Sequence, residues 1–329
     1  MKNGKQFKVR VRLRNVKIPK GRLTDLNEKI SKKQQLRNYE YYNMQVVFDQ
    51  LYKNSKENAK FTKLTKIIAS ENNIKLAYRS IKGNKGSKTK GTDGKTIVDY
   101  EGMKEEDFIQ YFQDKIENYQ PLSVRRVEIP KPNGKTRPLG IPCMEDRIVQ
   151  QCIKQVLEPI CEAKFYEHSY GFRPNRSTRH AVARYSYLVN IMKLHYVIDV
   201  DIKGFFDNVN HSKLLKQMWS LGIRDKKLLS IISKILKSEI EGIGMSSKGT
   251  PQGGIISPLL SNVVLNELDW WIASQWERLP TRHEYSGTNH KYRAIRNTDL
   301  KEMHIVRYAD DFKIFCSNPK SAQKVFFGC

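Results

Sequence analysis

The chain has 329 residues, of which 39% are hydrophobic and 28% charged, a composition typical of a folded globular protein rather than a disordered one. Its 59 lysine and arginine residues against 34 acidic ones give a formal net charge of +25, which favours a polyanionic partner, either nucleic acid or an acidic membrane surface. No apolar run is long enough to span a bilayer, and residues 1–18 lack the apolar core of a secretory signal. Five cysteines without a Cys-x-x-Cys pair are typical of a reduced intracellular protein.

The positive charge is concentrated near the amino terminus. Residues 1–100 hold 25 basic and 8 acidic residues, and residues 1–22 hold nine basic residues and no acidic one. Apolar residues alternate there with the cations Lys8, Arg10, Arg12 and Arg14. This two-residue period is typical of a strand with one cationic face, which would bind a phosphate backbone. A solvated basic tail is an equally good interpretation.

The remaining elements indicate an α+β domain that follows a helical extension. Residues 38–82 have helical periodicity, and the Gly- and Lys-rich residues 82–94 indicate a flexible basic loop. Strands are expected at 124–129, 137–141, 196–201, 305–308 and 312–316. Helices are expected at 107–119, 148–160, 211–219, 226–237 and 257–276.

Two acidic clusters lie on the strand-like segments. Asp199 and Asp201 share one face of a strand because they are two residues apart, and Asp310 and Asp311 lie at the tip of an apolar hairpin. A lone Asp-Asp pair is usually a solvated turn, but like charges beside buried strands are costly unless a cation binds there. If the two strands pair, Asp201 and Asp310 form an oxygen site for Mg²⁺. Together with the net charge, this suggests two-metal phosphoryl transfer on a nucleic acid.

Five motifs, in order, resemble those of reverse transcriptases. Tyr308-Ala309-Asp310-Asp311 resembles the Tyr-x-Asp-Asp signature, residues 201–207 resemble the first metal-binding motif, and residues 249–262 resemble the motif between them. Residues 129–142 and 169–177 are similar to stretches of group II intron-encoded reverse transcriptases, also called maturases. The resemblance covers residues 80–318. It implies an α+β fold, the fingers and palm of a right-hand polymerase, preceded by a mostly helical, basic amino-terminal extension.

The resemblance also implies a division of the chain. We expect a basic arm at 1–37, a helical extension with a basic loop at 38–102, fingers at 103–195 and a palm at 196–329. The chain ends some 18 residues after Asp311, whereas family members continue through the rest of the palm into a thumb and often into DNA-binding and endonuclease domains. An incomplete palm without a thumb is therefore expected.

The roles of single residues follow from the same resemblance. Asp201, Asp310 and Asp311 would be the catalytic carboxylates that hold two Mg²⁺ ions, and the carbonyl of Ile202 would be a further ligand. Asp199 has no counterpart in the motif and is expected to support the site or the strand.

Further residues would contact the substrates. The implied nucleotide-binding residues are Lys131, Arg137, Phe206 and Gln252. Phe206 falls at the sugar gate of the family, where a ring excludes a 2′-hydroxyl group; a core aromatic is the alternative. Arg173 and Arg176 resemble contacts to the template strand, and solvated loop arginines are an equal alternative.

The implied function is RNA-directed DNA polymerisation of the group II intron type. The partners would be deoxynucleotides, an RNA template, a DNA primer and the intron RNA, bound for splicing and mobility. The alternative is a splicing cofactor that binds RNA and has little or no polymerase activity in this shortened form. The long basic extension disfavours a retron-type or defence enzyme. A bacterial cytoplasmic ribonucleoprotein is expected, with an organellar one left open and no membrane partner; a homodimer does not follow from the sequence.

The basic arm leads to a first prediction. If the cations of residues 8–14 contact phosphates, deletion of residues 1–22 will flatten the slope of log affinity against log salt concentration by several units, because each contact contributes about 0.7–0.9. Affinity will fall for many RNAs alike, since phosphate contacts carry little sequence information. RNA binding measured across a salt series for the full chain and the deletion checks this; parallel lines would reject the arm as an RNA contact.

Overall fold

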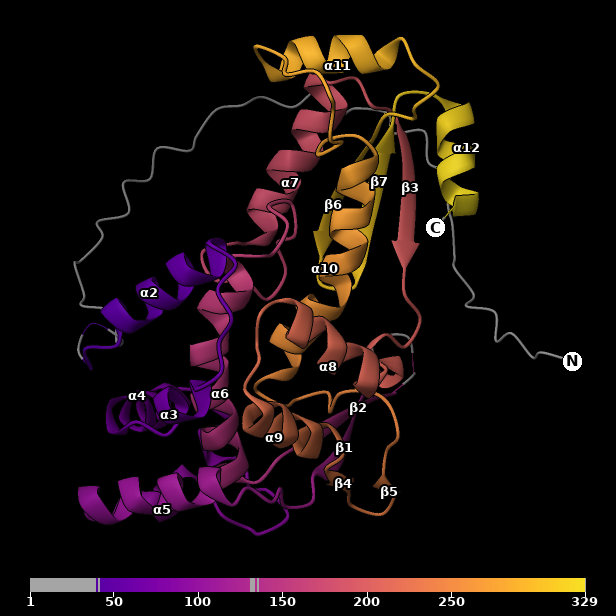
Figure 1. The fold of residues 1–329 in the computed structure, drawn as a ribbon. Coiled ribbons are helices and arrows are strands. Elements are labelled where there is room, and N and C mark those ends of the chain that lie inside the picture. Colours follow the sequence, from indigo (N-terminus) through magenta and orange to yellow (C-terminus); the bar gives the residue numbers. More distant parts are fainter. Residues whose placement is uncertain (1–39, 41, 131–133, 135, 329) are drawn as a thin grey trace, which may run out of the picture. The chain divides into compact units, whose positions relative to one another are not determined.

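The computed structural model describes residues 40, 42–130, 134 and 136–328, which form two compact units (Figure 1). Within those limits, unit 1 comprises residues 166–203 and 265–328, and unit 2 comprises residues up to 165 together with 204–264. Both units are built from segments far apart in the sequence, because strands of unit 1 pair across more than a hundred residues. The continuous ranges expected for fingers and palm therefore do not coincide with the compact units.

Unit 1 is organised around a three-stranded antiparallel sheet in the order β3-β7-β6 (Figure 1). The strands are β3 (Tyr196–Asp201), β6 (Met303–Tyr308) and β7 (Asp311–Cys316). One sheet face, with Ile198 and Ile314 near its centre, forms a core with three helices. These helices are α10 (Ser257–Gln275), which contributes through residues 265–275, α11 (Thr288–Arg296) and α12 (Pro319–Gly328). The three expected strands of this sheet are confirmed.

Among the described residues of unit 1, an apolar cluster covers one end of the opposite sheet face. Val197 and Phe315 pack there against α7 (Thr178–Ser186) and the π-helical turn Tyr187–Ile191 that follows it. The ring of Tyr185 meets that of Phe315 edge-on, with centroids 5.1 Å apart. Because side chains alternate along a strand, Asp199 and Asp201 lie on this same face, beyond its apolar cover. Asp201 is exposed and Asp199 is half-buried, and both belong to a strand that the core of unit 1 anchors.

Unit 2 is built around α6 (Met144–Glu162), which is buried along most of its length. Its neighbours are α2 (Gln45–Lys56), α3 (Leu64–Ile68), α4 (Glu71–Lys82) and α5 (Glu105–Glu117). The apolar stripe expected at 148–160 is confirmed, and the helix extends beyond it at both ends. In the first turn of α6, Asp146 accepts hydrogen bonds from Tyr119 Oη (2.8 Å) and the amide of Leu122 (3.0 Å). Burial raises the pKa of this carboxyl group to about 6.

The stretch predicted as a flexible loop is held by the same helix turn. The buried guanidinium group of Arg147 donates hydrogen bonds to the carbonyls of Gly86 (3.0 Å) and Thr89 (2.9 Å), as well as to that of Pro142 (2.7 Å). A 3₁₀ turn, Lys85–Lys88, lies within the stretch, and a second one, Ile97–Tyr100, follows it. Backbone carbonyls of the expected flexible basic loop are thus hydrogen-bonded to a buried arginine, and the flexibility of the loop stays a prediction.

The other elements of unit 2 are short. They are β1 (Arg125–Pro130), β2 (Thr136–Ile141), α8 (His211–Ser220), α9 (Lys226–Leu236), β4 (Glu239–Ile240) and β5 (Gly244–Met245). The expected hairpin is confirmed, with Arg125 paired to Ile141 and Pro130 to Thr136. The elements that the sequence did not reveal are α7, which buries no residue fully, α11, α12 and the two-residue strands β4 and β5. The two strands are too short to show a period, and α7 and α11 are polar helices that bury one residue at most, so local sequence does not distinguish them from loops.

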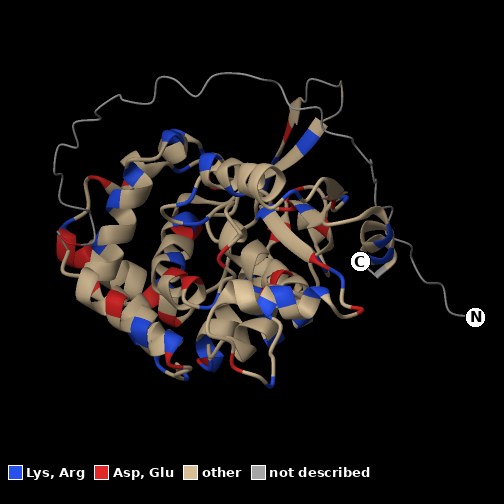
Figure 2. Ribbon diagram, turned by 90° about the horizontal axis from the view of Figure 1, so that it is seen from above, with Lys and Arg blue, Asp and Glu red and all other residues tan. Residues whose placement is uncertain are grey.

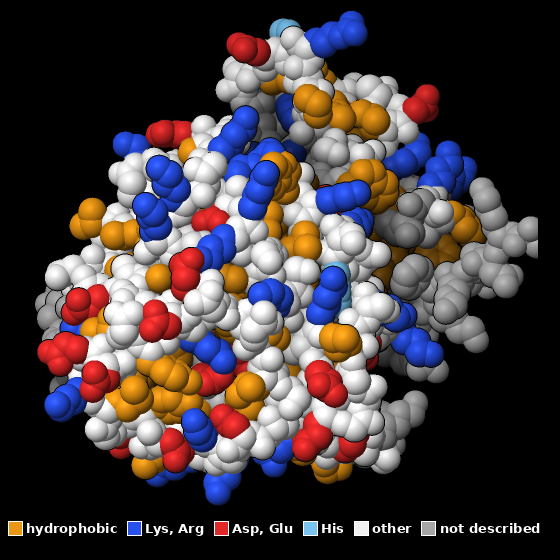
Figure 3. Space-filling view, turned by 60° about the horizontal axis from the view of Figure 1, so that its bottom comes forward, with side chains coloured by type: hydrophobic (Ala, Val, Ile, Leu, Met, Phe, Trp, Pro, Cys, Tyr) orange, Lys and Arg blue, Asp and Glu red, His pale blue; other side chains and the backbone are white. Residues whose placement is uncertain are grey.

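Charged residues are spread over both units. Lys and Arg are interspersed with Asp and Glu on helices and loops (Figure 2). The face of the molecule shown in Figure 3 likewise carries basic and acidic side chains side by side and has no uniform basic patch. In the part of the chain that the structure describes, every helix is too short or too polar to cross a membrane.

Candidate active site

The two acidic clusters meet in the sheet of unit 1. β3 and β7 pair antiparallel, so that Asp201 lies opposite Asp311 and Asp199 lies opposite Lys313. Directly opposed side chains have Cβ atoms about 4.5–5.5 Å apart, and like charges in such a pair destabilise the sheet. Asp310 is adjacent, in the turn that begins β7. The strand pairing on which the metal hypothesis depends is therefore present.

The turn that carries Asp310 has a constrained backbone. Ala309 and Asp310 connect β6 to β7, closed by the pair Tyr308 and Asp311. Ala309 has φ +58°, in the left-handed region that is unfavourable for a residue other than glycine. The side chain of Ala309 is buried. Contacts from the surrounding chain must therefore hold this conformation.

A buried ion pair supplies the first of these contacts. Arg307 Nε and Nη2 donate hydrogen bonds to the two carboxylate oxygens of Asp269 on α10, at 2.7 and 2.6 Å, and both side chains are 1% exposed. The remaining terminal nitrogen, Nη1, donates to the carbonyl of Ala309 at 2.8 Å. The planar guanidinium group thus connects α10 to the turn in a fixed geometry.

The second contact is a segment that runs beside β6. The amide of Tyr170 donates to the carbonyl of Arg307 (2.9 Å), and the amide of Arg307 donates to the carbonyl of His168 (3.1 Å). Gly171 then passes so close to the turn that a Cβ atom there would lie 2.2 Å from the backbone nitrogen of Ala309. Only glycine allows this approach, so part of the motif at 169–177 supports the turn.

The structure buries the side chain of Arg173, whose contact with the template stays a prediction. Its side chain is 6% exposed, and Nη1 donates to the carbonyls of Tyr166 (2.6 Å) and Ser169 (2.8 Å). Arg173 therefore ties together the segment that supports the turn. Arg176 is half-buried, donates to the carbonyl of Glu167 (2.6 Å) and lies 5.8 Å from the ring centre of Tyr170. Its contact with the template stays a prediction.

Lys313 is the cation beside the opposed carboxylates. Its Nζ atom lies 2.6 Å from Asp199 Oδ1 and 3.4 Å from Asp311 Oδ1. Burial alone would lower the pKa of Lys313, but the hydrogen bond with Asp199 and the charge of Asp311 raise it above its usual value. The amine therefore stays charged and is shared between the two strands.

In unit 2, the loop at 249–254 is held by its backbone. The amide of Gly249 donates to the carbonyl of Val209 (2.7 Å), and that of Thr250 donates to Phe206 (2.7 Å). Gly253 has φ +117°, and a Cβ atom there would lie 2.3 Å from a carbonyl oxygen of β2. The loop is thus fixed between β2 and the segment that contains Phe206.

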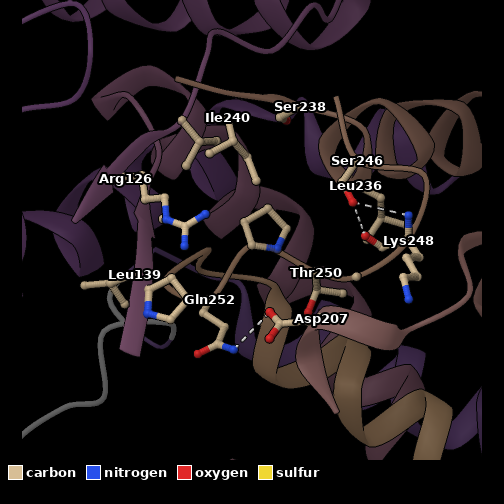
Figure 4. A pocket seen from close by; sticks show the side chains of 15 residues that line it. Arg126, Leu139, Asp207, Leu236, Ser238, Ile240, Ser246, Lys248, Thr250 and Gln252 are labelled. Atoms are coloured by element: carbon tan, nitrogen blue, oxygen red, sulfur yellow. Dashed lines mark hydrogen bonds between the residues drawn. The ribbon is translucent and has the colours of Figure 1, made fainter. Parts of the chain in front are cut away.

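Two predicted nucleotide contacts meet on this loop. Arg137 Nε donates to Gln252 Oε1 (2.8 Å), and Gln252 Nε2 donates to Asp207 Oδ1 (3.2 Å). Gln252 and Asp207 line a cavity of about 130 Å³, shown in Figure 4 with Arg126. Arg137 and Gln252 are thus linked by a hydrogen bond, as the nucleotide-binding prediction requires of neighbours. Asp207, which the sequence did not single out, is linked to Gln252 in the same way.

Phe206, the predicted sugar gate, lies in the same part of unit 2. It is 9% exposed, and the neighbouring Phe205 is 8% exposed. Their rings meet edge-on, with centroids 5.5 Å apart. The sequence suggested that one of the two must face inward, and both are in fact largely buried. The role of the Phe206 ring as a gate stays a prediction.

Five of the predicted contacts lie outside the described residues. They are Lys8, Arg10, Arg12, Arg14 and Lys131.

Comparison with known proteins determines the family. Residues 129–326 match the family model described as reverse transcriptase (RNA-dependent DNA polymerase), which is more than half of the chain. The chain belongs to the reverse transcriptase family. Its membership confirms the expected α+β fold of polymerase fingers and palm.

Curated relatives narrow the type of reverse transcriptase. The chain is 37% identical over 264 residues to the group II intron-encoded protein LtrA of Lactococcus lactis subsp. cremoris, and the match covers 78% of this chain but 43% of LtrA. It is 35% identical over 276 residues to protein YkfC of Escherichia coli strain K12, covering 79% of this chain and 71% of that protein. A solved partial Cas6-RT-Cas1–Cas2 complex is similar with a TM-score of 0.45 and 23% identity, over 78% of this chain and 38% of that one. The similarity to LtrA, a group II intron-encoded protein, agrees with the type that the sequence motifs indicate.

Sequence reasoning missed the residues that support the turn of the reverse transcriptase signature. Arg307 follows the apolar residues Ile305 and Val306 in β6, and Asp269 lies beside two tryptophans in the largely apolar helix α10. Opposite charges in largely apolar elements are the signal that could have indicated a buried pair. Arg307 and Asp269 are 38 residues apart, so the sequence does not show that these two charges pair with each other.

The ion pair yields a second prediction. Arg307→Met will lower the free energy of unfolding by about 3–5 kcal/mol, because it leaves Asp269 buried without a partner. The double variant Arg307→Met with Asp269→Leu will recover most of that loss, since an apolar pair can replace a buried ion pair at little cost. Urea denaturation measures both, with the exposed-site change Lys320→Met as the control. A double variant no more stable than the single one would contradict the assigned pairing.

Proposed function

We propose that this reverse transcriptase synthesises DNA on an RNA template by two-metal nucleotidyl transfer and binds the intron RNA for splicing and mobility. The observation that carries the proposal is the register of β3 on β7, in which Asp201 opposes Asp311 beside the turn that holds Asp310. Membership of the reverse transcriptase family indicates the class of reaction. The match covers 43% of LtrA, so the activity of a full-length relative is part of the proposal.

The donor set fits Mg²⁺. Asp201 and Asp311 are exposed and Asp310 is half-buried, so three carboxylates can offer the hard oxygen ligands that this ion prefers. An opposed carboxylate pair is also an unfavourable arrangement that a divalent cation relieves. Among the described residues, no three acidic, histidine or cysteine side chains already converge as a finished metal site. Ion binding would therefore turn the carboxylates toward a common point.

In this mechanism, Asp201, Asp310, Asp311 and the carbonyl of Ile202 would hold the two ions. When bound, the ions would supply Lewis-acid activation of the primer 3′-hydroxyl group and neutralise charge on the leaving pyrophosphate. The contribution of the protein is position. Arg307 holds the backbone of the turn by its hydrogen bond to the carbonyl of Ala309. The backbone of the neighbouring Asp310 is therefore already fixed before an ion binds, which lowers the entropy cost of positioning its carboxylate.

The incoming nucleotide would be held by residues of unit 2. Arg137 uses Nε for its bond to Gln252, and a guanidinium group has four further N–H donors for phosphate oxygens. Lys131 would add a point charge to the same triphosphate. Gln252 would contact the nucleotide and its templating base, on a loop whose backbone is already fixed. The ring of Phe206 would lie beneath the sugar.

RNA binding would depend mainly on phosphate contacts. The excess of lysine and arginine, and in particular the cations of residues 8–14, would supply these phosphate contacts. Arg176 is a further predicted contact with the template, and it lies within the described residues. A splicing cofactor without polymerase activity would need the same cations but not the carboxylates. The two functions can therefore be separated by changing the carboxylates alone.

The third prediction tests the metal site. Asp310→Asn will lower the rate of primer extension by orders of magnitude, because a neutral amide cannot balance the charge of two divalent ions. RNA affinity will change little, since the cations expected to contact phosphates, at residues 8–14 and Arg176, are left unchanged. Primer extension with deoxynucleotides and Mg²⁺ on an RNA template, beside an intron-RNA binding assay, measures both effects.

The matched control is Asp299→Asn, which removes an exposed carboxylate of unit 1 outside the site. Equal extension by Asp310→Asn and the parent, in a form of the protein that extends primers, would reject the metal site. If the parent binds and splices the intron RNA but never extends a primer, the cofactor function stands in its place.

The fourth prediction concerns the choice of sugar. Phe206→Ala will raise ribonucleotide incorporation relative to deoxynucleotide incorporation, because removal of the ring would admit a 2′-hydroxyl group. Phe205→Ala will leave this ratio unchanged. Both rings are buried, so each change will also cost roughly 3–5 kcal/mol of stability, and the paired variants are matched in this respect. An unchanged ratio in Phe206→Ala would assign that ring to packing alone.

A further inference from the structure

Four charged side chains form two opposed pairs on one face of the sheet in unit 1, beyond its apolar cover. Asp199 and Asp201 follow each other on β3, and Lys313 and Asp311 stand opposite them on β7. Three of these residues are acidic and one is basic. The motif of the family gives roles to Asp201 and Asp311, whereas Asp199 and Lys313 have none in the function proposed above.

We propose that Lys313 is a positioning residue that competes with divalent cations for Asp311, and that Asp199 limits this competition by holding the lysine amine. The inference rests on the proposed function, since it assumes that Asp311 helps to hold the ions. It assigns Asp199 and Lys313 to the tuning of metal affinity.

The distances support a shared amine. Lys313 Nζ lies closer to Asp199 Oδ1 (2.6 Å) than to Asp311 Oδ1 (3.4 Å). The side chains of Asp199 and Lys313 are 46% and 32% exposed, whereas that of Asp311 is 67% exposed. Asp199 is thus the principal partner of the amine, and the more exposed Asp311 keeps a weaker contact that an incoming ion can replace.

The charges explain why the amine acts as a competitor. A divalent ion held by Asp311 would share that carboxylate with the lysine amine, and the positive charges of the ion and the amine repel each other. The amine must therefore withdraw toward Asp199 when an ion binds. Asp199 offers it an anionic partner for that state, so the Asp199–Lys313 pair can remain while Asp311 turns to the ion.

Loss of the Lys313 charge and loss of the Asp199 charge should change the affinity for divalent ions in opposite directions. Lys313→Gln removes the competing charge and should tighten ion binding two- to fivefold, the range expected for a single partly exposed ionic contact. Asp199→Asn removes the alternative partner of the amine, leaves Asp311 as its nearest carboxylate and should weaken ion binding by a similar factor. The double variant should bind as tightly as Lys313→Gln, because Asp199 acts only through the lysine.

A merely structural role would give a different pattern. If the Asp199–Lys313 pair only stabilised the sheet, both single variants would weaken ion binding or leave it unchanged, together with a loss of stability. Lys313→Arg keeps the positive charge and should retain an affinity close to that of the parent. Opposite signs for Lys313→Gln and Asp199→Asn are therefore the distinguishing result.

The experiment is a titration of the full 329-residue chain with Mn²⁺ in place of Mg²⁺, without nucleic acid, followed by electron paramagnetic resonance of the free ion. Urea denaturation of each variant verifies its fold. Tighter binding by Lys313→Gln together with weaker binding by Asp199→Asn supports the inference. Shifts in the same direction, or none, overturn it. If Asp199→Asn does not fold, Lys313→Gln alone decides, since failure to tighten binding overturns the inference.

Asp201→Asn separates this inference from the function on which it rests. If Asp201→Asn leaves Mn²⁺ binding unchanged, the proposed metal site is wrong, and the inference falls with it. If Asp201→Asn weakens binding while the Lys313 and Asp199 variants do not diverge, the metal site stands and only the role of Lys313 is rejected.

Discussion

The pairing of β3 with β7 is the constraint on which the rest of the site depends. A register shift of one residue would move Asp201 to the opposite face of the sheet, because side chains alternate along a strand. The apolar ends of the same strands prevent such a shift: Val197 opposes Phe315, and Ile198 opposes Ile314, each pair packed against its own layer of helices. The core of unit 1 thus determines the position of carboxylates that themselves stand in solvent.

The turn between β6 and β7 shows how a strained backbone is held at a functional position. Ala309 has a left-handed conformation that an alanine rarely adopts, and the cost is offset by contacts from two directions. Arg307 bonds the carbonyl of Ala309 from within the core, and Gly171 lies against its backbone nitrogen. Two segments that carry none of the proposed metal ligands therefore determine where Asp310 stands.

The loop of unit 2 depends on backbone contacts in a similar way. Gly249 and Thr250 donate to the segment that contains Phe206, and Gly253 fits against β2 where any side chain would collide with a carbonyl oxygen. The polar side chains on this frame, Arg137, Gln252 and Asp207, already bond one another. Residues that would receive a nucleotide are thus ordered before it binds, which reduces the entropy lost on binding.

The sequence by itself determined the elements whose pattern is local and the residues that belong to ordered motifs. The apolar segments of β3, β6 and β7, the apolar stripe of α6, and the motifs that contain Asp201, Asp310 and Asp311 could be recognised without tertiary information, since they are patterns of neighbouring residues.

Only the tertiary structure decided which distant charges meet. It paired Arg307 with Asp269, placed Lys313 between Asp199 and Asp311, and buried Arg173 where the motif had suggested a template contact. A charged residue in the sequence shows no partner, because its burial and its neighbours are set by the packing of segments far away along the chain.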